Sequence, residues 1–196
     1  DHRFGKNRKG DLALLKERGQ AGDFQVEGIA LEQALGGSIS STAIRAAVAA
    51  GEVERAAELL GRPLSFLGEV VHGDHRGRTI GFPTANLALA PGVSAPALGV
   101  YVAEARVVES ETGVEEPPLP AVVNVGRRPT FKANDPDLIE AHLLSGGRDL
   151  YGQELELSFL RRLRDEKVFS GVDELVAQIQ RDVGAAREFF ALQHTT

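Results

Sequence analysis

The segment from His72 to Asn86 has the composition of a phosphate-binding loop. Three of its glycines fall within the nine residues from Gly73 to Gly81, and two arginines lie between them. Glycines let backbone N–H groups approach a polyanion, and guanidinium groups neutralise its charge. The segment lacks the Gly-Lys-Ser/Thr ending of a Walker loop, and the strands expected next argue against a dinucleotide fingerprint. We predict a phosphate-binding loop, with a plain glycine-rich turn as the alternative.

Thr84 and Asn86 follow Pro83 at a spacing of two residues. In an extended segment these two side chains point to the same side. A hydroxyl and an amide oxygen suit Mg²⁺, which takes few protein ligands when waters and phosphates supply the rest. The pair predicts a magnesium site; the alternative is a Pro-Thr turn whose side chains bond their own backbone.

Alternating apolar and polar residues after Gly61 predict the strands that must position these groups. The clearest candidates are 101–107 and 155–159, with shorter ones at 66–71 and 121–125. Five or six strands at this spacing indicate an antiparallel barrel.

Helices are expected toward both ends of the chain. Before Gly61, the expected elements are helices over 12–18, from Ser40 to Ala50 and over 53–60, and a strand over 24–29. A final helix is expected to open with Ser170 and Asp173 in capping-box spacing and to pack on the barrel. Its apolar stripe consists of Leu175, Ile179, Val183, Ala186 and Phe190.

The composition limits the class of protein. The 196 residues are 42% hydrophobic and carry a net charge of −6, so they suffice for a packed core but lack the basic field of a nucleic-acid binder. No run of 18 apolar residues and no secretory signal occurs, which favours a cytoplasmic protein without a membrane partner. The absence of cysteine excludes thiolate metal sites. Because methionine is also absent, we expect that an upstream part is missing.

Three longer motifs are specific in their residues and their order. They are Gly-Arg-Thr-Ile-Gly-Phe-Pro-Thr-Ala-Asn at 77–86, Asn-Val-Gly-Arg-Arg-Pro-Thr-Phe at 124–131 and Glu-Ala-His-Leu-Leu at 140–144. Over about 64–190 the chain closely resembles the riboflavin kinase module of the bacterial bifunctional riboflavin kinase/FAD synthetase family. The resemblance implies a mixed α and β fold, with a six-stranded antiparallel Greek-key β-barrel and a C-terminal helix. It also implies transfer of the ATP γ-phosphate to the terminal ribityl hydroxyl of riboflavin, giving FMN.

The resemblance assigns site residues to these motifs. The implied sets are Gly73, Arg78, Gly81, Thr84 and Asn86 for ATP, Thr84 and Asn86 for magnesium, Glu140 as the catalytic base, and Phe82, Arg164, Glu166 and Phe169 for the flavin. A strand with Ile139 and Ala141 on its apolar face leaves Glu140 on the other face, which is compatible with this role. Without the resemblance, 161–169 reads as a mixed-charge surface segment.

The first 61 residues resemble the end of the family's FMN adenylyltransferase module, through 1–10 and 39–45, and 62–196 is the expected kinase domain. An incomplete Rossmann-like α/β nucleotidyltransferase segment is therefore expected before the barrel. Asp1, Ser41, Thr42 and Arg45 are its implied site residues, the last three around a helix start that suits a triphosphate. The module's His-x-Gly-His phosphate motif does not occur here. We expect FMN but no FAD from this chain, and both from the intact protein.

Two further readings stay open, and a zinc site is not favoured. A non-catalytic flavin or nucleotide carrier on the same barrel would bind these ligands without turnover. The N-terminal helices can instead serve for self-association. His72 and His75 are three residues apart, but without cysteine or a further histidine nearby they lack the ligands of a zinc site.

Overall fold

The computed structural model describes residues 3–28, 33–34, 37–73, 76–90, 92–93, 95–108, 117–127, 138–146 and 148–193. The chain divides into two compact units, Asp1–Ile39 and Ser40–Thr196. The division falls before the second helix because Val53 of the third helix lies in the core of the larger unit. The module boundary expected after Gly61 stays a prediction.

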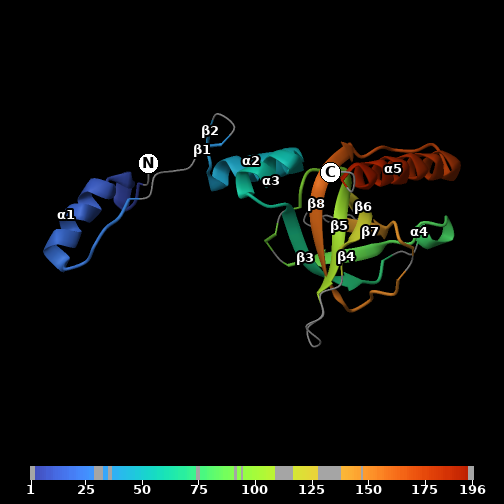
Figure 1. Cartoon of the computed structure of the whole chain (residues 1–196), viewed down its shortest axis with the longest axis horizontal. Helices are drawn as coiled ribbons and strands as arrows, with labels where there is room; N and C mark the ends of the chain where they lie inside the picture. Colours follow the sequence, from blue (N-terminus) through green and yellow to red (C-terminus); the bar gives the residue numbers. More distant parts are fainter. Residues whose placement is uncertain are drawn as a thin grey trace. The chain divides into compact units, whose positions relative to one another are not determined.

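The larger unit contains a closed antiparallel barrel of six strands (Figure 1). The strands are β3 (Leu64–Val71), β4 (Ala85–Leu89), β5 (Gly99–Val108), β6 (Leu119–Gly126), β7 (Leu138–Leu143) and β8 (Glu154–Arg164). Their order around the barrel is β3-β4-β7-β6-β5-β8. Three consecutive strands, β5 to β7, pair in sequence and β8 returns beside β5, which is a Greek key. The expected barrel is confirmed.

Residues of alternating positions along the strands fill the barrel interior. Tyr101, Ile139 and Phe159 are completely buried there. The ring of Phe159 meets those of Phe66 and Tyr101 edge to face, with centroids 5.4 and 5.3 Å apart. Such contacts stabilise a core beyond the area they bury. The side chains at the intervening positions therefore face the outside of the barrel, where a ligand can reach them.

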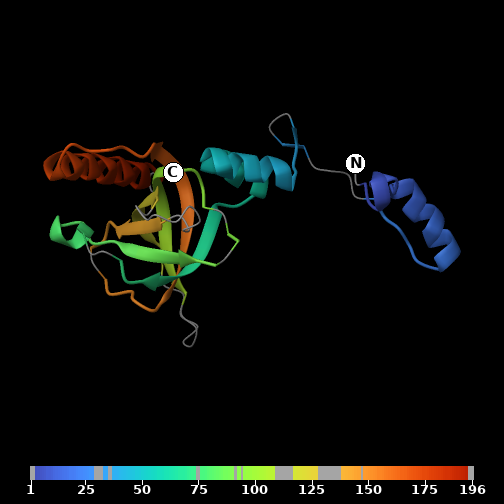
Figure 2. The ribbon, with the colours of Figure 1, turned by 180° about the vertical axis from the view of Figure 1, so that it is seen from behind.

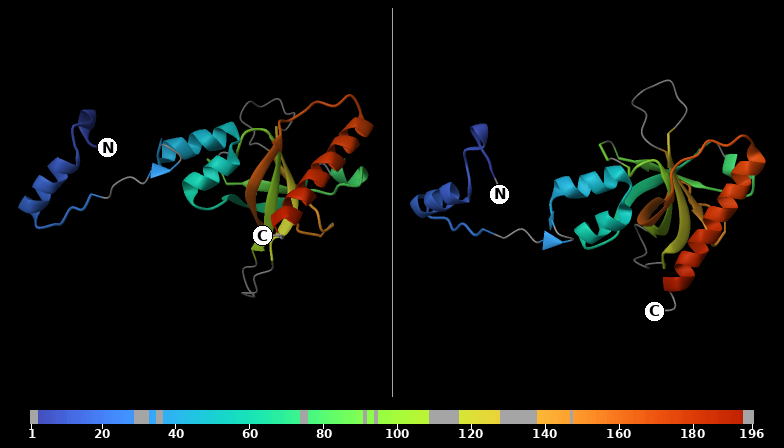
Figure 3. Two further views of the ribbon diagram at one scale, coloured as in Figure 1. Left: turned by 45° about the horizontal axis from the view of Figure 1, so that its top comes forward. Right: turned by 90° about the horizontal axis from the view of Figure 1, so that it is seen from above.

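The C-terminal helix α5 (Val172–Gln193) packs on the outer face of the barrel, as expected. Val183, Ala186 and Phe190 meet Val100 and Val102 in a second apolar cluster. Helix α5 and the short α4 (Arg76–Thr79) lie on the side of the barrel opposite α2 and α3 (Figures 2 and 3). No helix within the described residues is long and apolar enough to cross a membrane.

The capping box expected at the start of α5 is wrong in one residue, because Glu174 and not Asp173 bonds to Ser170. The backbone N–H and the hydroxyl of Ser170 donate to the carboxylate of Glu174, at 2.9 and 2.7 Å, rather than to Asp173. The helix begins at Val172, one residue later than a cap at Ser170 implies, so Glu174 is the residue that reaches back. These hydrogen bonds lower the pKa of Glu174, the backbone bond most strongly.

Helices α2 (Ser41–Ala50) and α3 (Val53–Leu60) match their expected limits. The hydroxyl of Ser40 accepts from Ala43 N at 3.2 Å and so caps α2. Gly51 and Gly61 end the two helices in the left-handed conformation, with φ of 73° and 70°.

Arg162 of β8 ties α2 to the barrel. Its guanidinium donates to the carbonyl oxygens of Ala50, at 3.1 Å, and Leu98, at 2.9 Å. The same group lies over the ring of Tyr101, whose hydroxyl donates to the carbonyl oxygen of Ala97. The end of α2 and the loop before β5 are thus held by one partly buried polar cluster.

This cluster makes the barrel sensitive to alkali. Burial raises the pKa of Tyr101 above its ordinary value of 10.0, an effect that nearby Arg162 opposes in part. The folded state therefore favours the neutral phenol of Tyr101. The stability that this phenol contributes is complete below pH 10 and is lost as the pH rises through the higher pKa of the folded state. We expect the unfolding free energy to fall more steeply above pH 10 in the parent than in Tyr101→Phe. Urea titrations at pH 8 to 11 measure this; equal slopes would contradict it.

The smaller unit corrects two expectations. Helix α1 (Leu12–Gly22) is capped by Asp11 as expected, but it continues past Gly19 and ends at Asp23, which adopts φ 58°. The strand expected over 24–29 does not form in its described part, because residues 24–28 have no ladder partner; residue 29 lies outside the described residues. The unit also holds the 3₁₀ turn η1 (Lys6–Arg8) and the paired strands β1 (Gln33–Ala34) and β2 (Gly37–Ser38).

Candidate functional site

Asn86 and Glu140 lie directly opposite each other on neighbouring strands. Asn86 of β4 is the register partner of Glu140 of β7. Their chain neighbours Leu87 and Ile139 belong to the interior core, so both side chains stand on the outer face. Cross-strand partners have Cβ atoms about 5 Å apart. The implied metal ligand and the implied base are thus adjacent.

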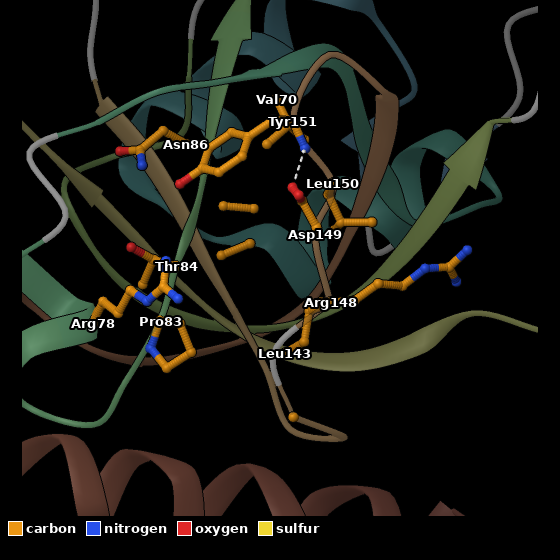
Figure 4. Close-up of a pocket in the computed structure, with 13 residues that line it drawn as sticks. Val70, Arg78, Pro83, Thr84, Asn86, Leu143, Arg148, Asp149, Leu150 and Tyr151 are labelled. Carbon is orange, nitrogen blue, oxygen red and sulfur yellow. Dashed lines mark hydrogen bonds between the residues drawn. The ribbon is translucent and has the colours of Figure 1, made fainter.

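A cavity of about 350 Å³ opens beside Asn86. Figure 4 shows Arg78, Thr84 and Asn86 on one side of it and Arg148, Asp149 and Leu150 on the other. Pockets of 300–1,000 Å³ are typical of small-molecule sites. Glu140 is not among the lining residues; β7 contributes Ala141 and Leu143 to the lining, and Glu140 is joined to the cavity only through its register partner Asn86. The lining consists of Val70, Arg78, Pro83, Thr84, Ala85, Asn86, Ala141, Leu143, Gly146, Arg148, Asp149, Leu150 and Tyr151.

The Asn86 side chain is buried against the backbone of Gly73. Asn86 is 4% exposed, and a Cβ added at position 73 would lie 2.3 Å from its Nδ2 atom. Any side chain at position 73 would therefore displace the amide. Oδ1 of Asn86 is buried and has no hydrogen-bond partner in the described part of the chain. A buried acceptor of this kind requires an explanation, and a cation held there would supply one.

The loop between β3 and β4 turns tightly to bring Thr84 to the cavity. Phe82 N donates to Gly77 O at 2.8 Å, and a Cβ at position 77 would lie 2.3 Å from the Phe82 carbonyl oxygen. Gly81 adopts φ 88°, which glycine tolerates without strain. Arg78 lies within this turn, on α4, and lines the cavity.

Phe82 and His142 fasten this loop to β7. Nδ1 of His142 lies at 2.9 Å from the carbonyl oxygen of Pro83, and its ring meets Phe82 edge to face at 5.4 Å. Phe82 also packs into the outer apolar cluster beneath α5. These contacts fix Phe82 and Pro83, the two residues before Thr84, and so hold Thr84 in place.

Arg164 is engaged by a carboxylate of α5. Its Nε and Nη2 donate to Asp182, with a shortest distance of 2.7 Å, and the two side chains are 15% and 7% exposed. The guanidinium also lies 5.9 Å from the ring centroid of Phe169. Glu166 projects toward β6, with Oε1 3.0 Å from the Cβ position of Gly126. Arg164 thus anchors the segment that carries Glu166 and Phe169, two of the other three expected flavin residues.

Sequence reasoning missed the wall of the cavity formed after β7. Asp149 Oδ1 accepts from Tyr151 N at 3.2 Å, and the Tyr151 and His72 rings lie 3.9 Å apart at a tilt of 31°. No signal in the sequence distinguishes this short connection from an ordinary turn. Its role is visible only because the barrel brings it opposite Thr84 and Asn86.

The expected adenylyltransferase residues do not line this cavity. Ser41, Thr42 and Arg45 are exposed in the first turns of α2, where Ser40 provides the cap. Asp1 lies outside the described residues, as does His75 of the zinc alternative.

Comparison with known proteins gives the family of this chain. The riboflavin kinase profile, named Flavokinase, matches residues 60–190. The chain belongs to the riboflavin kinase family. This family uses ATP and normally a divalent metal ion, and its reaction involves riboflavin and FMN.

Curated relatives are longer bifunctional enzymes. The bifunctional riboflavin kinase/FMN adenylyltransferase of Escherichia coli K12 is 45% identical over 192 residues, covering 98% of this chain and 59% of the relative. The Bacillus subtilis enzyme of the same name is 37% identical, covering 97% and 58%. A solved structure described as a macrolide-efflux protein from Streptococcus pneumoniae has a TM-score of 0.80 and 36% identity, covering 95% of this chain and 58% of that one.

Proposed function

We propose that this chain transfers the γ-phosphate of ATP to the terminal ribityl hydroxyl of riboflavin. The hydroxyl oxygen forms a bond to the γ-phosphorus, the bond from that phosphorus to the β,γ-bridging oxygen breaks, and ADP leaves. The hydroxyl proton passes to the Glu140 carboxylate. FMN and ADP are the products. The observation that carries the proposal is the pairing of Asn86 with Glu140 beside the cavity.

The cavity suits the nucleotide. It offers the guanidinium group of Arg78 for the phosphates and apolar side chains of Val70 and Leu143 for the remainder. Gly73 and Gly81 let the loop approach closely. Phosphoryl transfer depends mainly on positioning and charge neutralisation, so a preformed loop and a guanidinium group beside it meet part of its needs.

Thr84 and Asn86 fit a divalent ion. They present a hydroxyl and a buried amide oxygen without another partner among the described residues. Such an ion, for which we propose Mg²⁺, would neutralise charge on the transferring phosphate. The protein positions the two oxygens. Gly73 lies against the amide of Asn86, and His142 contacts the carbonyl oxygen of Pro83, next to Thr84.

Removing the amide should weaken the metal site. Asn86→Ala is expected to raise the Mg²⁺ concentration for half-maximal activity by roughly 10- to 100-fold, the scale of losses at metal sites. Titration of FMN formation with Mg²⁺ at saturating ATP measures it. Ala88→Ser, two residues along the same outer face, is the matched control, and its half-maximal concentration should match that of the parent. An unchanged half-maximal Mg²⁺ concentration in Asn86→Ala would show that Asn86 does not hold the metal ion.

The flavin is proposed to lie on the side of Glu140 away from the nucleotide cavity. Glu166 and Phe169 belong to the segment after β8, which Arg164 holds through Asp182 and its contact with Phe169. We assign Arg164 a supporting role here, since its guanidinium is already engaged. Phe82 is proposed to act by packing the loop that carries Thr84.

Incubation with riboflavin, ATP and Mg²⁺, with chromatographic separation of riboflavin, FMN and FAD, tests the function. FMN formation is the expected result. Riboflavin binding without FMN formation would instead identify the non-catalytic carrier, which the enzymatic names of the relatives do not favour.

We further propose that 1–61 is the end of an adenylyltransferase module and 62–196 the kinase domain, in a cytoplasmic protein that makes both FMN and FAD when intact. The relatives that carry both activities in their names support this. Asp1, Ser41, Thr42 and Arg45 would then belong to the second site. The same chromatographic assay should show no FAD from FMN and ATP with this chain, since the His-x-Gly-His motif is absent.

A further inference from the structure

Three polar side chains form a row across the outer face of the barrel. Glu140 of β7 is the register partner of Asn86 on one neighbouring strand and of Asn124 on the other. Val123 and Val125, on either side of Asn124, belong to the interior core, so Asn124 faces outward like Glu140. Cross-strand partners have Cβ atoms about 5 Å apart. An asparagine therefore stands on each side of the proposed base.

The two asparagines have different surroundings. Asn86 is buried at the cavity, whereas Asn124 is partly exposed. Nδ2 of Asn124 and Oε1 of Glu166 lie 3.2 and 3.0 Å from the Cβ position of Gly126, so both groups stand next to that glycine. The next partner along the row is Val100, which belongs to the apolar cluster beneath α5. The polar row therefore ends at Asn124, beside the Glu166 segment.

We infer that Asn124 hydrogen-bonds the ribityl chain of riboflavin, at hydroxyls next to the one that is phosphorylated. The inference rests on the proposed function. With ATP on the Asn86 side of Glu140, the polyol must approach from the opposite side, which Asn124 occupies. An amide donates and accepts, as a hydroxyl does, so one side chain can satisfy both roles of a vicinal diol. Asn124 is partly exposed, and no hydrogen bond between described residues uses its amide.

Comparison of two flavins tests this assignment. Riboflavin carries the ribityl chain, whereas lumiflavin carries a methyl group in its place. Asn124→Ala should raise the dissociation constant of riboflavin, followed by flavin fluorescence, by about 5- to 10-fold, as expected for lost neutral hydrogen bonds. The dissociation constant of lumiflavin should stay unchanged. In turnover, KM for riboflavin should rise by a similar factor while KM for ATP stays the same.

Two further variants separate recognition from folding. Asn124→Ser keeps a shorter hydrogen-bonding group and should recover part of the riboflavin affinity. Ser158→Ala removes a polar group from the outer face of β8 and should leave both flavins unaffected. Equal losses for riboflavin and lumiflavin, or no loss for either, would overturn the assignment. The proposed function fails separately, if the parent chain forms no FMN, and the binding comparison still decides the role of Asn124.

Discussion

Replacing Glu140 by Gln is expected to lower kcat for FMN formation by roughly 10²- to 10⁴-fold, the contribution of a general base. Glutamine keeps the size and polarity of the side chain but cannot take the proton of the ribityl hydroxyl. Because Glu140 does not line the cavity that we propose for the nucleotide, the affinity for ATP should change little. Single-turnover FMN formation at saturating ATP and riboflavin measures the chemical step, and equilibrium titrations measure binding.

Glu156→Gln is the matched control for this variant. Glu156 also stands on the outer face of a strand, β8, but none of the proposed site residues lies opposite it. Its kcat should stay within about twofold of the parent value, as for ordinary surface substitutions. A Glu140→Gln enzyme with parental kcat would show that another group takes the proton. A loss of flavin affinity equal to the loss of kcat would make Glu140 a binding residue instead.

Asp182→Ala is expected to reduce the unfolding free energy by about 3–5 kcal/mol, because it leaves a buried guanidinium without its partner. Arg164 and Asp182 are only 15% and 7% exposed, and Nε2 of Gln178 also donates to the same carboxylate at 2.8 Å. No other carboxylate is recorded within ion-pair distance of Arg164 among the described residues. Urea unfolding followed by circular dichroism measures the change.

Two variants define what the Asp182 result means. Glu188→Ala removes an exposed carboxylate from the same helix and should change stability by no more than about 0.5 kcal/mol. The double variant Arg164→Met/Asp182→Leu removes both charges and should recover most of the lost stability, since apolar replacements of buried ion pairs are often neutral. An Asp182→Ala protein as stable as the parent would mean that solvent reaches Arg164 freely.

This ion pair also links the fold to the proposed flavin side. Arg164 ends β8, and the segment carrying Glu166 and Phe169 begins directly after it. The pair fixes the start of that segment to α5, while Ser170 and Glu174 fix its end to the first turn of the same helix. Both attachments are on one helix, so α5 both covers the barrel and holds the segment beside Gly126.

Local patterns were sufficient for most elements of the larger unit. The limits of α2 and α3 follow from a serine cap and two glycines, whose conformational preferences act within a few residues. The alternation in β5 and β8 follows from one buried and one outward face. The strand predicted over 24–29 is wrong in its described part, because a strand also needs a neighbouring strand to pair with, and the local pattern does not show whether one is present.

Candidate site residues could be proposed from the sequence and its family resemblance, but their arrangement could not be predicted. The spacing of Thr84 and Asn86 already places both on one side of an extended segment. By contrast, Glu140 lies more than fifty positions away in the chain, and only the pairing of β4 with β7 brings it opposite Asn86. Likewise, Asp182 becomes the partner of Arg164 only when α5 docks on the barrel.

Residue types and short spacings therefore predicted the strands and the helix caps, and they marked the loop before β4 and the pair Thr84 and Asn86 as candidates, because each depends on interactions within a few residues. Glu140 was indicated by the family resemblance. Tertiary structure alone decided that Asn86, Glu140 and Asn124 form one row, that the connection after β7 closes the cavity, and that Arg164 is held by Asp182. These contacts join segments whose sequence separation carries no information about distance. Strand register and helix docking, which minimise exposed apolar surface over the whole barrel, are what bring them together.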